Sequence, residues 1–570
     1  PDDKKLGTDI YIPKKYTMKA KNNQKVVVEI TKLPKADKNA EGKIVEIIGY
    51  IDQAGVDMLS LVKEYDLPYE FPKPVLDEAK SIKQEIDKKD IANRRDLRNE
   101  EIFTIDGEDA KDLDDAVNVK KLENGNYILG VHIADVSHYV KEGSFLDEEA
   151  IARGTSVYML DRVIPMLPVE LSNGICSLNA MKDRFAISCV MEINESGEVV
   201  SSDIFKSVIK VTERMSYTNV QKILDNSDKV VVKYYSKYIE HFKRMEELAH
   251  ILKKRREKAG SLDLNIPETK VILNERGIAV DITKYELTFA NEIIEQFMLT
   301  ANETVAEKFF WLEAPFIYRV HEAPDMDKVS ELNKFLFNLG YRIKCKKDEV
   351  HPTAFAEVLS KIKGKPEERV VSNLVLRTLK VARYESENKG HFGIASKYYC
   401  HFTSPIRRYP DLFIHRIISK YLSHGYNLSE EDIEKYSAQA SKYAEESSER
   451  EKIAQKVERE SVDIKMAEYM EGHIGEEYDG VISSITSFGI FVELENTVEG
   501  MIRFDKLGNE YFIYDENNKT LLGEKTKTMY HIGDKIRIRV IRADKNSRQI
   551  DFEKVLSEEE TEGNIVEEKE

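Results

Sequence analysis

Cysteine and tryptophan are scarce in this sequence. Its 570 residues include four cysteines and one tryptophan. The cysteines are scattered and form no C-x-x-C pair, the spacing typical of zinc and dithiol sites. We therefore expect neither a disulfide framework nor a structural zinc site, and a reducing compartment, the cytoplasm, suits such a chain.

Long apolar runs are lacking as well. No segment approaches the roughly 18 consecutive apolar residues that a membrane-spanning helix needs, and no signal peptide is visible. The sequence therefore predicts no membrane partner. A chain of 570 residues is also too long for one hydrophobic core, so three or four domains are expected.

Basic residues are outnumbered, and the formal net charge is −17. A uniformly acidic surface would repel phosphate groups, which argues against a nucleic-acid binder. The charge is unevenly distributed, however. Residues 558–570 hold seven Glu and one Lys, whereas residues 503–548 hold eleven Lys and Arg against seven acidic residues. An RNA-binding face is thus compatible with the composition.

The densest chemical feature is an acidic cluster in residues 104–117, T-I-D-G-E-D-A-K-D-L-D-D-A-V. Six acidic side chains fall within ten positions of it, and apolar residues flank it on both sides. The pattern predicts a loop between two strands that turns at Gly107. Carboxylates this close raise one another's pKa unless a cation lies among them, and oxygen ligands suit Mg²⁺ or Mn²⁺.

Four of these carboxylates can reach one or two cations. In an extended segment Asp112 and Asp114 point to the same side, and Asp106 can return to that side across the turn. Asp115 can approach from a bent backbone. The spacing alone leaves three interpretations open, which are a catalytic metal site, a structural ion and a solvated acidic loop. A calcium-binding loop is not indicated, because the Glu at its twelfth position is absent.

Three sequence blocks resemble the signatures of the ribonuclease II and ribonuclease R family. They are the acidic cluster, then R-G-T-S-V-Y-M-L-D-R-V-I-P-M-L-P with L-S-N-G-I-C-S-L-N within residues 153–179, and H-F-T-S-P-I-R-R-Y-P-D-L-F-I-H-R at residues 401–416. The second block resembles the ribonuclease R branch in particular. Three long motifs in the same order are far more specific than one short pattern, and they favour the catalytic metal site.

This resemblance implies an activity. The chain is expected to be a processive, hydrolytic 3′-to-5′ exoribonuclease that uses Mg²⁺, or alternatively Mn²⁺, and releases nucleoside 5′-monophosphates. Its substrate would be single-stranded RNA or RNA with a 3′ overhang, and it would act as a monomer. Polarity, product and RNA preference rest on the resemblance alone, because no spacing in the sequence shows them.

The resemblance also assigns roles to single positions. The metal ligands would be the four aspartates named above, with Asp114 and Arg407 as catalytic residues. Tyr158 would stack on the nucleotide beside the scissile end and limit how short the product becomes, and Phe316 would be a second aromatic clamp. The other expected RNA contacts are Arg408, Glu458, Phe488, Phe491, Arg503, Asp544 and Arg548.

Some of these assignments have independent support from the residue types. A fixed guanidinium such as that of Arg407 can pair bidentately with a phosphate. Phe488 and Phe491 flank a glycine, and aromatic residues beside a basic residue such as Arg503 on a small barrel suit unstacked single-stranded bases. Without the resemblance, a core tyrosine is the favoured interpretation of Tyr158.

The predicted architecture is α+β and multidomain. Residues 1–72, with strands expected at 25–30 and 43–51, resemble a cold-shock OB-type β-barrel. Residues 73–470 would form the α/β RNB catalytic domain, beginning with a charged linker. Residues 475–555 resemble an OB-fold RNA-binding barrel, and 556–570 form an acidic tail. Relatives usually carry a helical region and another cold-shock domain before this point, so we expect the sequence to be a trimmed form.

Two helical predictions concern the central domain. Apolar residues repeat at helical spacing through residues 287–310, which predicts an amphipathic helix of six turns or more. The charged stretch 431–471 predicts a pair of helices covering the core.

Two rival functions belong to different classes. The first is a catalytically silent RNA-binding protein on the same scaffold, which the intact set of four aspartates argues against. The second is a metal-dependent phosphodiesterase with other substrates, which the terminal OB-type modules argue against.

Overall fold

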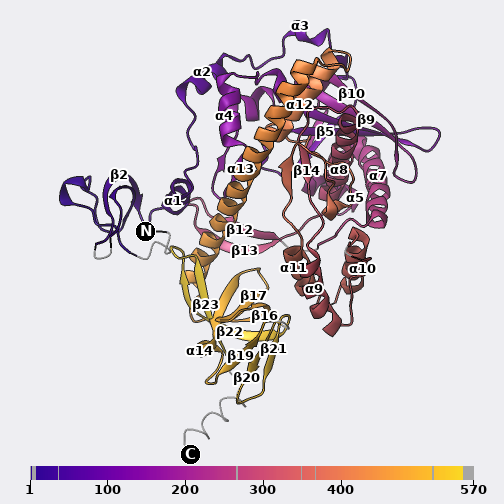
Figure 1. Ribbon diagram of the computed structural model, residues 1–570. Helices are drawn as coiled ribbons and strands as arrows, with labels where there is room; N and C mark the ends of the chain where they lie inside the picture. The colour runs from indigo at the N-terminus through magenta and orange to yellow at the C-terminus, as the bar shows by residue number, and fades with distance from the viewer. Residues whose placement is uncertain are drawn as a thin grey trace, which may run out of the picture.

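The computed structural model describes residues 2, 8–35, 38–264, 268–347, 349–365, 367–516 and 519–555. Within these ranges the chain forms an N-terminal β-hairpin unit, a large central α/β unit and a C-terminal barrel (Figure 1). Helices and strands are both abundant, which confirms the predicted α+β multidomain class. The predicted acidic tail lies outside the described residues.

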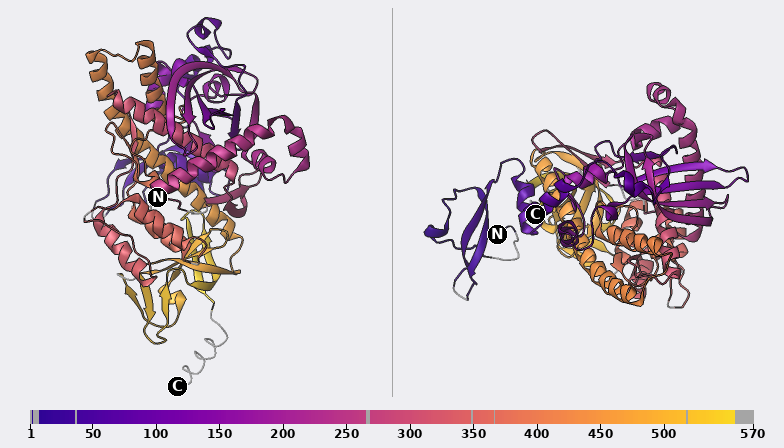
Figure 2. Two further views of the ribbon diagram at one scale, coloured as in Figure 1. Left: turned by 90° about the vertical axis from the view of Figure 1, so that its right-hand side faces the viewer. Right: turned by 90° about the horizontal axis from the view of Figure 1, so that it is seen from above.

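The N-terminal unit is built on two antiparallel strands, β1 (Gln24–Lys32) and β2 (Glu41–Tyr50). They confirm the two strands predicted there. Helix α1 (Val56–Glu64) follows and packs against β2. The hairpin stands to one side of the central unit (Figure 2).

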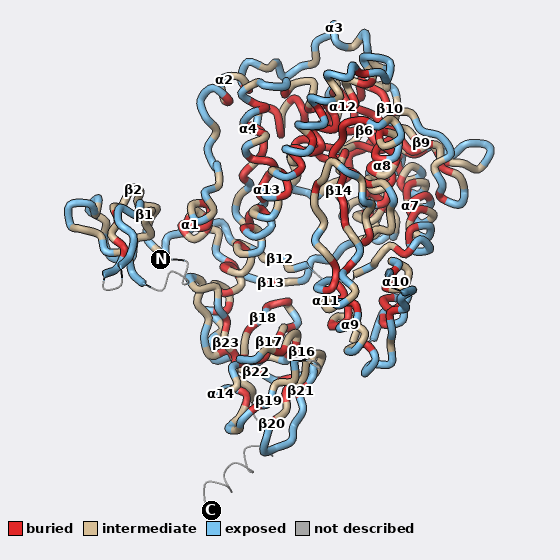
Figure 3. Tube along the Cα trace, viewed as in Figure 1, coloured by how far each residue is buried: buried red, intermediate tan, exposed pale blue. Residues whose placement is uncertain are grey.

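A seven-stranded sheet forms the middle of the central unit, in the order β11-β4-β5-β6-β9-β10-β3. Most neighbours are antiparallel, whereas β11 with β4 and β10 with β3 are parallel. The strands are β3 (Arg95–Asp96), β4 (Phe103–Asp106), β5 (Asp115–Lys121), β6 (Tyr127–Ala134), β9 (Asp183–Ile193), β10 (Val199–Lys210) and β11 (Glu213–Ser216). Buried side chains on both faces of β6 and β9 show that other elements cover the sheet on both sides (Figure 3).

Helices α7 (Ile239–Ala259) and α8 (Phe289–Trp311) pack together and against this sheet. Helix α8 confirms the helix predicted at 287–310, but it is buried on several sides and not along a single face as an amphipathic helix would be. It begins at a capping box in which the Thr288 side chain binds the third helical amide and Asn291 reaches back. Residues on several sides of α8 are buried, because it runs through the core.

The stretch 431–471 is one helix and not the predicted pair. Helix α13 (Glu430–Glu471) runs unbroken for 42 residues, a length of about 63 Å. Its sequence contains no glycine or proline, so nothing interrupts the hydrogen-bond ladder. Figure 1 shows α13 passing from the central unit to the C-terminal barrel. Buried Lys465 on it pairs with Asp57 of α1 at 2.7 Å, and Met470 joins the barrel core.

The remaining elements of the central unit are shorter. The charged linker contains two short helices, α2 and α3. These elements are α2 (Lys73–Ser81), α3 (Lys88–Ile91), η3 (Val136–His138), α4 (Phe145–Arg153), β7 (Val157–Tyr158), β8 (Val163–Ile164), η4 (Glu170–Ile175), α5 (Tyr217–Leu224), α6 (Lys229–Tyr234), β12 (Glu268–Leu273), β13 (Ala279–Tyr285), β14 (Tyr318–Val320), α9 (Met326–Asn338), α10 (Pro352–Ile362), α11 (Glu368–Thr378), β15 (Arg383–Glu385) and α12 (Tyr409–Ser423).

The C-terminal unit is a closed barrel of five strands in the order β16-β17-β18-β23-β22. These are β16 (Glu477–Ile485), β17 (Gly489–Leu494), β18 (Glu499–Arg503), β22 (Lys535–Asp544) and β23 (Gln549–Lys554). Gly500 is required for closure, because a Cβ there would lie 2.4 Å from the Phe552 ring. Between β18 and β22 lie α14 (Phe504–Leu507) and a small sheet of β19 (Phe512–Asp515), β20 (Thr520–Gly523) and β21 (Met529–His531).

No helix in the described ranges combines the length and the apolar character needed to cross a bilayer.

Candidate active site

The acidic cluster forms a loop between β4, which ends at Asp106, and β5, which begins at Asp115. Asp106, Asp112, Asp114 and Asp115 all line one pocket of about 330 Å³. The other two acidic residues of the cluster, Glu108 and Asp109, are exposed and do not line it. The loop therefore separates four inward carboxylates from two solvated ones.

Backbone contacts fix the shape of this loop. Arg214 donates to the carbonyl oxygens of Glu108 at 2.8 Å and Ala110 at 2.7 Å. Buried Ser177 accepts from the Leu113 amide at 3.1 Å and donates to the Lys111 carbonyl at 2.8 Å. The loop is held from both ends, so the positions of its aspartates are set by the fold rather than by their own repulsion.

The pocket concentrates negative charge in a buried place. Burial, followed by the charge of Asp115, raises the pKa of Asp106, and burial raises the pKa of Asp114 and Asp115 as well. One oxygen each of Asp106 and Asp115 is buried without a hydrogen-bond partner among the described residues. In the described ranges no group of three or more Asp, Glu, His or Cys side chains is arranged so that it could hold a metal ion as it stands. The donor types nevertheless suit hard divalent cations, because four carboxylates line one cavity and two of them have an oxygen without a partner.

The third sequence block adds positive charge to the same pocket. The Ile406 amide donates to Asp114 Oδ1 at 2.9 Å, and Arg407 lines the cavity beside it. Arg407 makes no ion pair within the described part of the chain, so its guanidinium is available to a ligand. Arg408 also lines the pocket, but Asp411 holds it through two hydrogen bonds of 3.0 and 2.7 Å.

Tyr158 and Glu458 lie at the edge of this pocket. The Tyr158 hydroxyl donates to Asp112 Oδ2 at 3.0 Å, and its backbone amide donates to Glu458 Oε1 at 2.8 Å. Tyr158 is 37% exposed, which rules out the interpretation as a core tyrosine. Burial raises the pKa of both Tyr158 and Glu458. The structure thus brings together residues 300 positions apart.

Phe316 does not belong to the site, and its prediction as an aromatic clamp is wrong. Its side chain is 1% exposed and stacks on Phe309 in the core, with ring centroids 5.1 Å apart. No base can reach it. Phe316 follows α8 in the chain, and its ring packs on Phe309 of that helix rather than against the pocket.

The C-terminal barrel presents an aromatic pair at the start of β17. Phe488 is 58% exposed, and its ring meets the ring of Phe491 edge-on at 6.3 Å. Gly489 between them pairs with exposed Arg503 across the sheet. The arrangement leaves one aromatic face and one guanidinium open to solvent on the same edge.

Asp544 and Arg548, predicted as RNA contacts of this barrel, are engaged within the protein instead. Asp544 accepts from the backbone amides of Asn546 and Ser547 and closes the turn after β22. Arg548 pairs with Glu64 of α1 at 2.6 Å and with Glu460 of α13. Arg548 therefore ties three units together, a role that the sequence could not show because its partners are distant in the chain.

Comparison with known protein families matches all three units. An RNB domain matches residues 94–424, a cold shock domain residues 1–72, and an S1 RNA binding domain residues 472–554. Ribonuclease R of Thermotoga maritima is 46% identical over 566 residues, which cover 99% of this chain and 79% of that protein. The chain belongs to the ribonuclease R family. Ribonuclease R of Escherichia coli is 35% identical over 565 residues, covering 98% of this chain and 69% of the relative.

Solved ribonuclease R structures share the fold. Ribonuclease R of Mycoplasma genitalium, in complex with ribose-methylated single-stranded RNA, superposes with a TM-score of 0.91 at 28% identity, over 97% of this chain and 86% of that one. Yeast Ssd1, a pseudonuclease, gives a TM-score of 0.70 at 19% identity, over 90% and 64% of the two chains, which shows the fold alone.

Membership of the ribonuclease R family establishes what this chain does. It is a hydrolytic 3′-to-5′ exoribonuclease of RNA degradation, it binds RNA, and it depends on a divalent metal. The prediction of a cold-shock unit, an RNB catalytic unit and a C-terminal RNA-binding barrel is confirmed.

Several residues that the sequence did not point to also line the aspartate pocket. Tyr217 follows Ser216, the strand partner of Asp106, so sheet pairing places it there. Asn302 on α8 accepts from the Phe402 amide at 2.9 Å. Glu295 and His401 complete the wall. His401 stands in the third sequence block and could have been found there, whereas α8 gave only a core pattern.

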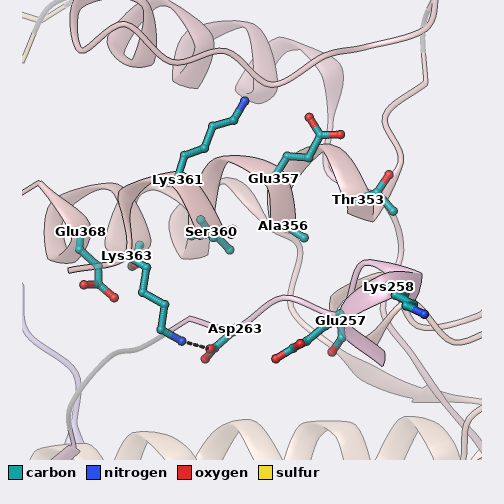
Figure 4. A pocket seen from close by; sticks show the side chains of 13 residues that line it. Glu257, Lys258, Asp263, Thr353, Ala356, Glu357, Ser360, Lys361, Lys363 and Glu368 are labelled. Atoms are coloured by element: carbon teal, nitrogen blue, oxygen red, sulfur yellow. Dashed lines mark hydrogen bonds and ion pairs between the residues drawn. The ribbon is translucent and has the colours of Figure 1, made fainter. Parts of the chain in front are cut away.

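The largest cavity among those described lies away from the aspartates. It measures about 680 Å³ and lies between the end of α7 and α10 (Figure 4). Its charges are of both signs and partly neutralise each other, since Lys363 binds Asp263 at 3.1 Å. A smaller cavity of about 400 Å³ lies between it and the catalytic pocket. This smaller cavity and the catalytic pocket have Glu295 and Leu299 in common. The largest cavity is therefore not the candidate active site, because the carboxylates that could take part in catalysis line the smaller pocket.

Proposed function

We propose that the aspartate pocket binds two Mg²⁺ ions, with Mn²⁺ as a substitute, through Asp106, Asp112, Asp114 and Asp115. The observation that carries this proposal is the pair of buried, unpartnered oxygens on Asp106 and Asp115 in a cavity lined by all four carboxylates. Burying such charge without a cation is unfavourable, which raises the pKa of both groups. Bound cations would supply an activated water and stabilise the leaving oxygen.

The side chains around the carboxylates have separate tasks in this proposal. Arg407 lies beside Asp114 and would neutralise negative charge that develops on the scissile phosphate. Tyr158 would stack on the nucleotide at the reacting end and, through its hydroxyl, orient Asp112. Arg408, fixed by Asp411, would contact the phosphate as a preset donor. Glu458 would hold the Tyr158 backbone and face the terminal ribose.

The substrate is proposed to be single-stranded RNA or RNA with a 3′ overhang, degraded processively to nucleoside 5′-monophosphates. Phe488, Phe491 and Arg503 would capture the strand at the barrel, outside the catalytic pocket. Mycoplasma genitalium ribonuclease R has been solved with single-stranded and with double-stranded RNA, which supports RNA as the substrate class.

The proposal extends to the state of the protein. We place the unit boundaries at residues 1–72, 73–470 and 475–555, and we propose a monomer. All four cysteines are free thiols, three of them buried, which supports a reducing compartment and therefore the cytoplasm.

A labelled-RNA assay tests the proposed chemistry. The protein is incubated with 5′-labelled RNA and with the matching DNA, in Mg²⁺, in Mn²⁺ or in EDTA. A ladder that shortens from the 3′ end only with RNA and metal, with nucleoside 5′-monophosphates as the released product, is the expected result. Cleavage in EDTA, or release of 3′-monophosphates, would rule out the proposed metal role.

A further inference from the structure

A second pocket lies at the far end of α12 from the catalytic site. Arg408, in the catalytic pocket, caps the N-terminus of α12, whereas Ser419 and Lys420 lie in its last turns. Fifteen helical residues span about 22 Å, so the two pockets are well separated. The second pocket measures about 360 Å³ and lies near β10, at the end of the molecule away from the C-terminal barrel (Figure 1).

Its lining carries an excess of positive charge. The cations are Lys141, which follows η3, Lys206 on β10, and Arg416 and Lys420 on α12. The single carboxylate among the lining residues is Glu142. Three elements that are distant in the sequence therefore direct cations at one cavity, in a chain whose net charge is −17.

The negative charge nearby is already matched. Glu142 pairs with Lys435 at 2.7 Å and accepts from Tyr436 and Gln439. Arg416 has its own partner, Asp147, at 2.7 Å. Asp135 beneath the pocket pairs with Arg94 at 2.6 Å. The charge of Asp135 still acts on Lys141 and Lys206, and that of Asp90, which lies 3.4 Å from His138, acts on Lys141, but neither carboxylate forms an ion pair with a lysine of the pocket.

Three lysines of the described chain consequently line the pocket without a contacting carboxylate. Within the described part of the chain, Lys141, Lys206 and Lys420 form no ion pair; Lys420 only passes over the Tyr436 ring at 5.8 Å. Burial lowers the pKa of Lys141 and of Lys206. Ser419 adds a buried hydroxyl that has no hydrogen-bond partner among the described residues. Lys141 is exposed, and Lys206 and Lys420 are half-buried. An anion that entered the cavity would therefore meet three cations that no carboxylate contacts directly.

From this arrangement we infer that the pocket formed by Lys141, Lys206, Ser419 and Lys420 binds a phosphate group. Three ammonium groups and a hydroxyl suit an anion with several acceptor oxygens, and lysine binds phosphate as a point charge. A cavity of this size has room for a mononucleotide rather than for inorganic phosphate alone. The phosphate belongs either to a free mononucleotide or to an RNA strand that passes over this face.

Binding to the full chain in EDTA tests the inference, because the metal-free aspartate pocket repels anions there. The variant replaces the three lysines, Lys141→Gln, Lys206→Gln and Lys420→Gln. The control carries the same change of charge at Lys254, Lys258 and Lys361, which lie on α7 and α10. Calorimetry follows adenosine 5′-monophosphate, and fluorescence anisotropy follows a long single-stranded RNA over a series of salt concentrations.

A free mononucleotide as ligand predicts that the unmodified chain and the control bind adenosine 5′-monophosphate and that the lysine variant loses at least about tenfold in affinity. An RNA strand as ligand predicts instead a smaller salt dependence of RNA binding in the lysine variant, by about 0.7 for each phosphate that the lysines no longer neutralise. If the lysine variant and the control agree in both measurements, the pocket is not a phosphate site.

A variant with two substitutions controls for the possibility that the triple variant misfolds. Lys141→Gln with Lys420→Gln spares Lys206, which lies within a strand of the central sheet. Its melting temperature should equal that of the control, and the same loss of binding should appear in weaker form. A double variant that folds normally and binds both ligands fully would overturn the inference.

Discussion

The Ile406 backbone amide donates a 2.9 Å hydrogen bond to Asp114 Oδ1, across 292 positions of sequence. The bond joins the acidic loop to the segment that carries Arg407, so the most buried aspartate of the pocket and the adjacent cation are positioned together. Asp114 therefore has a structural partner on one oxygen, and the other oxygen is the one that we propose as a metal ligand.

Asp114→Asn should abolish hydrolysis while leaving RNA affinity within a small factor. Asparagine keeps an oxygen for the Ile406 amide but removes the charge that would face the metal. The loss of turnover should exceed about 100-fold, the upper range for outer partners of a metal site. Single-turnover rates with labelled RNA measure it. Asp109→Asn is the matched control, because Asp109 is exposed on the same loop; equal rates in the two variants would exclude the metal assignment.

Tyr158→Ala should still degrade RNA but stop at a different final oligomer. Stacking on the exposed ring would hold the last few nucleotides once the shortened strand no longer reaches the barrel. Tyr158→Phe keeps the ring and removes only the hydrogen bond to Asp112. It should therefore slow the reaction without changing the length of the end product, as resolved on a sequencing gel. An unchanged end product in Tyr158→Ala would refute the stacking role.

Phe316→Ala should destabilise the protein and leave the end product as it is. The ring is buried against Phe309, and a buried Phe→Ala change costs about 3–5 kcal/mol. Chemical denaturation monitored by circular dichroism measures the decrease in stability. A shift in final oligomer length at a temperature where the variant is folded would return Phe316 to the RNA path.

Phe488→Ala with Phe491→Ala should weaken the capture of long RNA by about tenfold or more, because stacking is worth roughly 1–3 kcal/mol per base. The salt dependence should barely change. Arg503→Gln should instead reduce that dependence by somewhat less than one unit. Turnover of a saturating tetranucleotide, which does not need the barrel, is the control for both variants. If the double Phe variant slows this turnover and leaves the affinity for long RNA unchanged, Phe488 and Phe491 do not capture the strand as proposed.

The metal-free protein should lose stability as the pH rises. Burial and the charge of Asp115 raise the pKa of Asp106 from 3.8 to about 8, and burial raises that of Asp115 to about 6. The folded state then binds more protons than the unfolded chain between about pH 4 and pH 8, so its stability falls across that window. In EDTA the melting temperature should be lower at pH 8 than at pH 5. Asp106→Asn should reduce this difference, and Asp109→Asn should preserve it.

The sequence by itself determined the local secondary structure and the types of functional group that are present. Apolar flanks around the acidic cluster set a loop between β4 and β5, because strand-forming residues can satisfy their backbone groups only by pairing. Apolar residues at helical spacing likewise predicted the helix α8. The residue types of the cluster, hard oxygen donors at high density, suit a divalent cation, but only the resemblance favoured a catalytic metal site over a structural ion or a solvated loop.

Only the tertiary structure decided which side chains meet. The closeness of Asp112 to Tyr158, of Asp114 to the Ile406 amide, and of Arg548 to Glu64 depends on packing between segments far apart in the chain. The resemblance suggested Phe316 as a clamp, and only the packing of its ring on Phe309 shows that it belongs to the core. An ion pair likewise depends on a distance in space, which is why Arg548 looked free for RNA and the lysines around α12 gave no signal at all.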